Sequence, residues 1–155
     1  MSNFKWSIAK AAYTKEFPDG TLKRVLEHYI VSSMSFTDAE ATMYEQLGEF
    51  VKGEFFVKSI TPIDIADLFQ YDDSDVWYKI KVEYLIEDAD TGKEKTSRDI
   101  FFVTARSINQ ANERVAENLK ELLVSYRIVK SEETPIQEVY LHSNELEGGS
   151  YDEQE

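Results

Sequence analysis

The sequence predicts an α+β fold: an internally duplicated ββαβ unit whose antiparallel sheet is packed by two helices with pseudo-twofold symmetry. Three observations predict it. The stretch from Trp6 to Phe69 recurs about 72 residues further on, from Trp77 to Tyr140. Each copy holds segments with alternating apolar residues, typical of strands, and one segment with a helical apolar stripe. Glycine-containing turns separate the paired strands in both copies.

Apolar, turn, lysine and helix positions all recur between the two copies. The matches are Trp6 with Trp77, Tyr13 with Tyr84, Gly20 with Gly92, Lys23 with Lys95, Ser35 with Ser107, Ala39 with Ala111, Leu47 with Leu119, and Phe56–Ser59 with Ile128–Ser131. Because one copy of about 70 residues is marginally stable alone, we expect both to share one core. We predict a single domain over residues 1–142, made of repeats 4–69 and 76–140.

In the first copy, the predicted strands are Lys5–Thr14 and Leu22–Ser32, followed after the helix by Glu54–Ile60. The turn between the first two holds Pro18 and Gly20, since Pro presets a bend and Gly tolerates positive φ. Apolar and polar residues alternate along the second strand, but the pattern does not decide which of its two faces is buried. One face carries Leu22, Leu26, Ile30, Arg24 and His28; the other carries Val25, Tyr29, Val31, Lys23 and Glu27.

In the second copy, the strand that begins at Trp77 has the clearest two-sided pattern of the chain. Its apolar face holds Tyr78, Ile80, Val82, Tyr84 and Ile86, and its opposite face holds Trp77, Lys79, Lys81 and Glu83. We predict a turn over Asp88–Gly92, return strands at Thr96–Thr104 and Ser125–Ser131, and a linker at residues 70–75. Each copy runs into Thr-Pro-Ile, after which a short terminal strand can follow.

Capping signals place the start of each helix. In the first copy, Thr37 with Glu40 forms a capping box, and Phe36 can pack onto the first turn. In the second copy, Asn109 takes the cap position and Ile108 the position of Phe36. We expect Gly53 to end the first helix. The predicted buried stripes are Ala39, Met43, Leu47 and Phe50, and Ala111, Val115, Leu119 and Leu122.

The chain is acidic, with a formal net charge of -13. Residues 143–155 hold five carboxylates and no base, which leaves 25 acids against 17 bases in the body. Strong binding to duplex nucleic acid needs many contacts from Lys and Arg to phosphates, so this balance argues against it. We interpret residues 143–155, with Gly148 and Gly149, as a flexible acidic tail.

The chain has no cysteine, so it offers no disulfide and no cysteine-based metal site. It has no apolar targeting segment at its start and no apolar run long enough to span a membrane. We therefore expect a cytoplasmic protein without membrane contact. The oligomeric state stays open.

Several short motifs occur in order along the chain. They are Trp6 with Lys10 and Tyr13, Asp19–Val25, Ser35–Ala41, Trp77–Val82, Thr91–Lys95 and Glu133–Ile136. Over about residues 4–140 the sequence resembles an uncharacterised domain-of-unknown-function family found in Bacteroidetes and in phages that infect them. The resemblance implies a bacterial or phage protein of about this length, and it brings no catalytic residues with it.

Matched basic and aromatic residues are the chief candidate for a site. The predicted nucleic-acid-binding residues are Trp6, Lys10, Lys23, Lys58, Trp77, Lys79, Lys81, Lys95 and Lys130. A base can stack on Trp while ammonium groups follow the phosphates, which is typical of sequence-tolerant single-strand binding. The alternative interpretation is structural: the lysines are solvated strand residues that protect sheet edges, and each Trp packs at a rim.

The acidic tail is a second indication, because it resembles the tails of several single-strand-binding proteins, where the tail recruits partners and competes with nucleic acid. The alternative is a terminus that only adds solubility. Three hypotheses follow: a single-stranded nucleic-acid-binding protein; a protein-interaction module such as a phage adaptor, virion component or inhibitor of a host system; and an enzyme of unrecognised type, ranked last.

Signals for catalysis, metals or cofactors are weak. The only histidines, His28 and His142, are far apart, and no Gly-x-Ser-x-Gly elbow or phosphate-binding loop occurs. Asp88-x-Asp90-x-Gly92 resembles the opening of a calcium loop, but the Glu expected at its end is replaced by Asp99. We interpret it as a hairpin turn, and Asp72, Asp73 and Asp75 as solvated linker residues. We predict no catalytic residue, no metal, no cofactor and no enzymatic activity.

Overall fold

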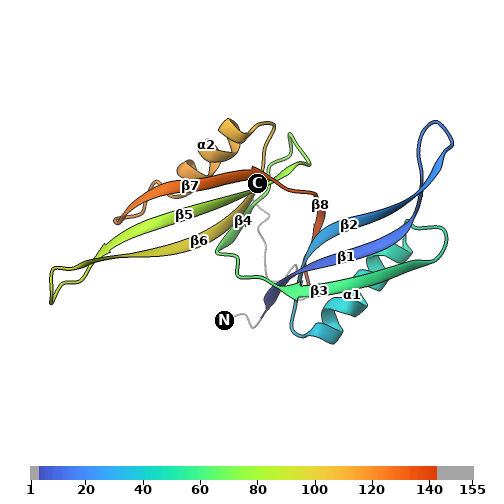
Figure 1. Ribbon diagram of the computed structural model, residues 1–155, viewed down its shortest axis with the longest axis horizontal. Coiled ribbons are helices and arrows are strands. Elements are labelled where there is room, and N and C mark those ends of the chain that lie inside the picture. The colour runs from blue at the N-terminus through green and yellow to red at the C-terminus, as the bar shows by residue number, and fades with distance from the viewer. Residues whose placement is uncertain (1–3, 143–155) are drawn as a thin grey trace. The chain divides into compact units, whose positions relative to one another are not determined.

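A computed structural model describes residues 4–142 of the chain and confirms the α+β class (Figure 1). Among these residues there are two helices and eight strands. The elements are β1 (Lys5–Glu16), β2 (Leu22–Ser33), α1 (Phe36–Gly48), β3 (Phe55–Pro62), β4 (Asp67–Phe69), β5 (Trp77–Glu87), β6 (Glu94–Thr104), α2 (Ile108–Asn118), β7 (Ser125–Glu133) and β8 (Ile136–Tyr140). The predicted order of strands and helices in each copy is confirmed.

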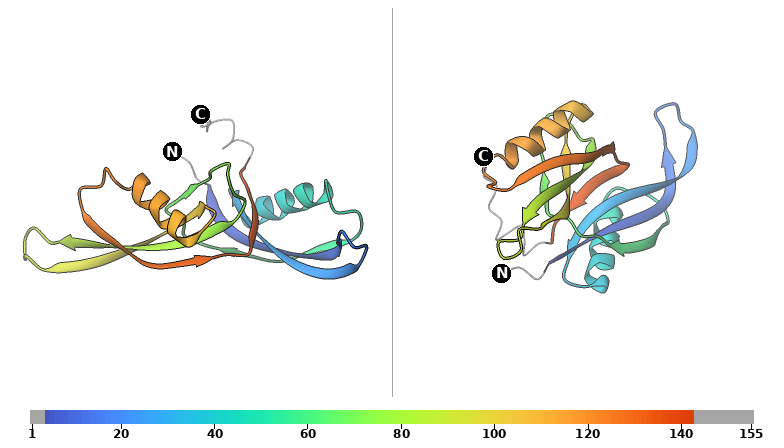
Figure 2. Two further views of the ribbon diagram at one scale, coloured as in Figure 1. Left: turned by 90° about the horizontal axis from the view of Figure 1, so that it is seen from above. Right: turned by 60° about the vertical axis from the view of Figure 1, so that its left-hand side comes forward.

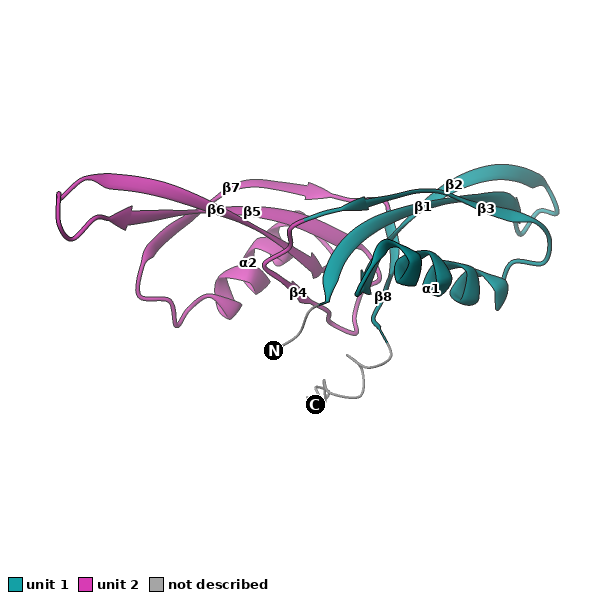
Figure 3. Cartoon of the chain, turned by 90° about the horizontal axis from the view of Figure 1, so that it is seen from below, with its two compact units in different colours: residues 1–63, 136–155 teal, residues 64–135 magenta. Residues whose placement is uncertain are grey.

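The chain divides into two compact units (Figure 3). Unit 1 runs to Ile63 and resumes at Ile136, and unit 2 is Asp64–Pro135. Unit 1 contains a four-stranded sheet in the order β3-β1-β2-β8, and unit 2 contains one in the order β4-β6-β5-β7. In each unit the helix packs on one face of the sheet, as Figure 2 shows for α1 and α2 separately. We call the opposite face of each sheet its outer face.

Each unit has its own cluster of buried apolar side chains, where the sequence led us to expect one shared core. In unit 1, α1 contributes Ala39, Met43 and Leu47, which pack on Ala9, Ala11, Tyr29 and Val31. In unit 2, α2 and the residue that follows it contribute Ala111, Val115 and Leu119, which pack on Tyr78, Ile80, Val82, Phe101 and Val103. The helical stripes are confirmed except at their last members, because Phe50 and Leu122 are exposed.

Both β-hairpins close through the predicted glycine turns. Gly20 and Gly92 have φ of 87° and 72°, in the region that side chains disfavour. In the second turn, the Asp88 carboxylate accepts hydrogen bonds from the backbone N–H groups of Asp90 and Thr91. These bonds fix a hairpin turn, as predicted, and leave this carboxylate facing its own backbone.

The helices begin earlier than the capping signals led us to expect. Ser35 and Ser107 are the N-caps, and their hydroxyl oxygens accept from the backbone N–H groups of Asp38 and Gln110 at 3.1 Å each. Thr37 and Asn109 therefore lie inside the helices, and the exposed Phe36 is the first helical residue. A second capping pattern, Ser35-x-x-Asp38, occurs two residues before Thr37, which explains the error in the first copy. Likewise α1 ends at Gly48, well before Gly53.

The predicted linker at residues 70–75 is a packed segment of unit 2. Tyr71 packs against the core cluster, and its backbone N–H donates to the hydroxyl of Thr104 at 2.6 Å. Arg114 donates twice to the carboxylate of Asp73, at 3.0 and 2.6 Å, and stacks on the Tyr71 ring. Asp73 therefore holds a structural ion pair, so its interpretation as a solvated linker residue was wrong.

The terminal strand of each repeat lies in the sheet of the other repeat. β4 follows β3 in the chain but pairs in parallel with β6, and β8 follows β7 but pairs in parallel with β2. A short terminal strand was predicted, but its partner was not. No helix among the described residues is long and apolar enough to cross a membrane.

Candidate nucleic-acid interface

The outer face of unit 2 carries lysines from two neighbouring strands. Side chains alternate along β5, so the burial of Ile80 and Val82 against α2 directs Lys79 and Lys81 to the outer face. Lys81 lies directly opposite Lys130 of β7, and Lys79 lies opposite Glu132. These four residues line a small cavity of about 30 Å³. Three of the predicted site residues are therefore brought together here.

Two arginines on the same face hold a buried carboxylate. Glu83 is 8% exposed and lies opposite Arg98 of β6 and Arg127 of β7. The Nε atoms of Arg127 and Arg98 donate to the carboxylate at 3.0 and 3.1 Å. These hydrogen bonds, from Arg127 and then from Arg98, hold the pKa of Glu83 below its ordinary value. Both arginine side chains remain well exposed, at 74% for Arg127 and 59% for Arg98.

The middle of this face carries more bases than acids. Between the Trp77 and Glu83 positions it holds Lys79, Lys81, Lys130, Arg98 and Arg127 against Glu83 and Glu132. Like charges directly opposite each other on a sheet repel, as at Lys81 and Lys130. The Nζ of Lys130 approaches Glu132 only to 3.7 Å, and Lys81 forms no salt bridge with any of the residues 4–142. An anion held between the two ammonium groups would relieve this repulsion.

The outer face of unit 1 combines bases with an exposed aromatic ring. Lys10 lies opposite His28 and Ser59. Two residues further along β1, Ala12 lies between Leu26 and Phe56. Phe56 is 47% exposed, and the Arg24 guanidinium lies 5.7 Å from its ring centroid. Burial first, and then the charge of Lys10, lowers the pKa of His28. The face therefore offers one ring and at least two positive charges.

The two tryptophans differ in exposure. Trp6 is half-buried on β1, whereas Trp77 is 1% exposed, so its ring is not available to stack on a base in this conformation. Their backbones share a role: the carbonyl oxygen of Trp6 accepts from the N–H of Ile63, and that of Trp77 accepts from the N–H of Thr134. The repetition of Trp thus coincides with a repeated hydrogen bond at the end of each sheet.

Three other predicted lysines lie away from these groups. Lys23 and Lys95 are exposed and lie opposite Lys15 and Ile86, on the helix side of their sheets near the hairpin ends. Lys58 is exposed on the edge strand β3, next to a bulge. The match of Lys58 with Lys130 was wrong, because Lys10 pairs with Ser59 where the equivalent Lys81 pairs with Lys130.

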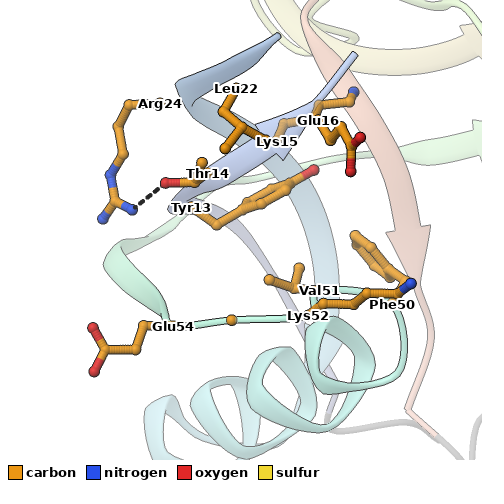
Figure 4. Close-up of a pocket in the computed structure, with 11 residues that line it drawn as sticks. Tyr13, Thr14, Lys15, Glu16, Leu22, Arg24, Phe50, Val51, Lys52 and Glu54 are labelled. Atoms are coloured by element: carbon orange, nitrogen blue, oxygen red, sulfur yellow. Dashed lines mark hydrogen bonds between the residues drawn. The ribbon is translucent and has the colours of Figure 1, made fainter. Parts of the chain in front are cut away.

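A larger cavity of about 690 Å³ lies at the hairpin end of unit 1 (Figure 4). Tyr13, Lys15 and Arg24 line it from the hairpin, and Phe50 to Glu54 line it from the loop after α1. Two of these lining residues donate to the carboxylate of Glu27, Tyr13 through its hydroxyl at 2.8 Å and Lys15 at 3.2 Å, and the hydroxyl of Tyr29 donates to it at 2.9 Å. Burial raises the pKa of Glu27, but these hydrogen bonds outweigh it and the net pKa is lowered.

The family comparison covers nearly all of the described residues. The model of a family defined by a domain of unknown function, DUF4494, matches residues 5–142. The chain belongs to the DUF4494 family. No curated protein matches the chain. The matched DUF4494 region includes residues of both units and both terminal strands, so the duplicated architecture lies within one family domain.

Sequence reasoning missed some residues of the candidate interface. Arg98 and Arg127 neighbour Glu83, and Arg24 lies over Phe56. A signal for Arg98 exists, because a hairpin turn over Asp88–Gly92 sets the register that places it opposite Glu83. No such signal exists for Arg127, because a bulge shifts the register of β7. Among residues 4–142, no group of three His, Asp or Glu side chains is placed to hold a metal ion.

Proposed function

We propose that the chain binds single-stranded nucleic acid through the outer faces of its two sheets. The observation that carries the proposal is the basic centre of the unit 2 face, where Lys81 and Lys130 lie directly opposite each other with Arg98 and Arg127 nearby. Phosphates satisfy such a group of cations. In unit 1, the exposed Phe56 ring beside Arg24 suits stacking of an unpaired base.

The charge balance favours single strands over duplexes. A net charge of -13 repels the dense phosphates of a duplex, and each outer face offers only a few cations. A single strand has unstacked bases, so ring stacking adds about 1–3 kcal/mol per base to these few phosphate contacts. This combination supports salt-sensitive binding to a short stretch of single strand.

The predicted acidic tail, residues 143–155, lies outside the described residues. Within this proposal, its five carboxylates compete with nucleic acid for the basic faces and recruit a protein partner. The proposal also keeps the predictions of a non-enzymatic role, a cytoplasmic location and an origin in Bacteroidetes or their phages. The sequence resemblance supports the last of these.

Fluorescence anisotropy with a labelled oligonucleotide tests the proposal. With about three to five phosphate contacts, log K should fall against log salt with a slope of roughly -2 to -4. Lys81→Glu with Lys130→Glu should weaken binding at least about tenfold. Lys23→Glu with Lys95→Glu is the matched control, because it makes the same charge change on the helix side. A chain that ends at residue 142 should bind more tightly. Equal loss from both double variants, or no binding at low salt, contradicts the proposal.

A second test uses His28, whose pKa is lowered by burial and by Lys10. A phosphate bound beside Lys10 offsets the charge of that lysine, so an oligonucleotide should raise the pKa of His28. NMR titration of the His28 ring signals measures this directly. His142, whose Nε2 lies 3.1 Å from an Asp38 oxygen, supplies a reference signal in the same spectrum. An unchanged His28 titration at saturating oligonucleotide removes unit 1 from the proposed interface.

Exposed apolar residues favour a second candidate, a protein-interaction module. Leu123 is fully exposed between Leu122 and Val124, and Leu22 and Leu26 are 67% and 53% exposed. Clusters of exposed apolar side chains commonly mark protein contacts. If the oligonucleotide tests fail, Leu123→Ser should reduce capture of a host protein, whereas Lys81→Glu should not.

A further inference from the structure

The exchange of terminal strands follows one geometry in both units. In unit 2, Leu68 of β4 pairs with Phe102, and in unit 1, Val139 of β8 pairs with Ile30. These positions are equivalent in the two repeats. The next residue in each terminal strand is aromatic, and each stacks on a ring of the acceptor strand: Tyr140 on Tyr29 at 5.5 Å, and Phe69 on Phe101 at 5.7 Å. The exchange is therefore a repeated feature of the fold.

The short connection before β8 prevents the second repeat from completing its own sheet. The position beside β6, which β4 occupies, lies three strand spacings from β7, or about 14 Å. From Glu133 to Ile136 an extended chain covers at most about 11 Å. Thr134 also precedes a proline, which favours an extended backbone and opposes a reversal of direction. β8 must therefore pair with a different sheet.

The acceptor edge depends on the strand that it receives. Without β8, the backbone N–H and C=O groups on the outer edge of β2 lose their partners, and an unpaired edge recruits other strands. Ile30 and Val31 of β2 are completely buried, and their strand partners in β8 are Val139 and Tyr140. The outer edge of β2 is thus a binding site for a parallel strand that carries an apolar residue followed by an aromatic one.

We propose that this site also takes β8 from a second copy of the chain, so that two copies form a dimer by reciprocal strand exchange. The donor is chemically identical, so each exchanged dimer restores the same hydrogen bonds and the same Tyr29–Tyr140 stack. The in-chain strand has an effective concentration on the order of 1 mM because its tether is short. Exchange therefore becomes substantial when the chain refolds near that concentration.

Disulfide trapping in the full-length chain tests the exchange. The sequence has no cysteine, so Ile30→Cys with Val139→Cys places two thiols only at paired positions of β2 and β8. The variant is unfolded, refolded at increasing concentrations and then oxidised. The disulfide-linked dimer should rise from about 1% near 10 µM to about half near 1 mM. The matched control, Thr14→Cys with Arg24→Cys, lies in one hairpin and should remain a linked monomer.

Three outcomes overturn the proposal: a linked monomer at every concentration, an equal rise of dimer in the control, and no disulfide between positions 30 and 139. Because Ile30 is buried, the cysteine variant can fail to fold, so the unmodified chain supplies a second measurement. Refolded near 1 mM and then diluted, it should show a dimer by size-exclusion chromatography with light scattering that reverts only after renewed unfolding. A monomer under those conditions also overturns the proposal.

Discussion

The two units fill the space between helix and sheet differently: in unit 1 the larger side chain comes from the helix, and in unit 2 the larger side chains come from the central strand. In unit 1, the central strand β1 contributes only Ala9 and Ala11 to the core, and α1 fills the space with Met43. In unit 2, β5 contributes Ile80 and Val82, and α2 contributes the smaller Val115. Repeats that began alike can therefore diverge in sequence while the helix stays on the same face, because only the summed volume must be conserved.

The two units also differ in where each holds a hydrogen-bonded carboxylate. Unit 1 holds Glu27 on the helix side of its sheet, where Tyr13, Tyr29 and Lys15 donate to it. Unit 2 holds Glu83 on the outer face between two arginines, and at the equivalent position unit 1 has Ala12. The hydrogen-bonded carboxylate therefore lies on the outer face of the sheet in unit 2 and on the helix side of the sheet in unit 1. The two arginines outnumber the one carboxylate, so this group adds net positive charge to the outer face of unit 2, where unit 1 has the uncharged Leu26, Ala12 and Phe56.

The largest expected effect comes from removing the helix volume of unit 1. Met43→Ala should lower the free energy of unfolding by about 2–5 kcal/mol, because β1 has only alanines opposite and cannot fill the cavity. Val115→Ala in unit 2 should cost less, since it removes a smaller group next to larger strand residues. Urea unfolding followed by circular dichroism measures both. An equal loss from the two substitutions contradicts the volume comparison.

A smaller effect tests the same idea by adding volume. Val115→Met overpacks unit 2 and should cost about 1–3 kcal/mol. Ile80→Ala with Val115→Met reproduces the volume distribution of unit 1, so the double variant should be more stable than the sum of the two single losses predicts. A double-mutant cycle in urea measures this coupling. Strict additivity would show that the two positions do not share one space.

Those features of the fold that depend on neighbouring residues, such as strand faces and turns, were predictable from the sequence. Alternation placed Lys79 and Lys81 on one face of β5, and Gly20 and Gly92 located the turns. The partner of each terminal strand was not predictable, because the pattern of β8 records which residues are buried but not which sheet receives them. For the site, the duplication selected Trp77, which is buried, because a repeated residue can mark a repeated structural position as readily as a binding position.

The smallest expected effect concerns acid stability and separates the two carboxylates from ordinary surface acids. The pKa of Glu83 lies below its ordinary value of 4.5, first because Arg127 and then because Arg98 donates to the carboxylate. A lowered pKa means that the unfolded chain binds the proton first as the pH falls. The stabilisation is therefore present above about 4.5 and is lost as the pH falls through the lower pKa of the folded state.

Glu83→Gln should flatten the fall of stability with acid, and Glu27→Gln should do so too, because the pKa of Glu27 is also lowered. Urea midpoints measured between about pH 6 and pH 3 give these slopes. The exposed Glu121→Gln is the control and should keep the slope of the unmodified chain. If Glu83→Gln alone keeps that slope, the two arginines do not hold the carboxylate in solution. Arg98 and Arg127 would then be free to bind phosphate on the outer face of unit 2.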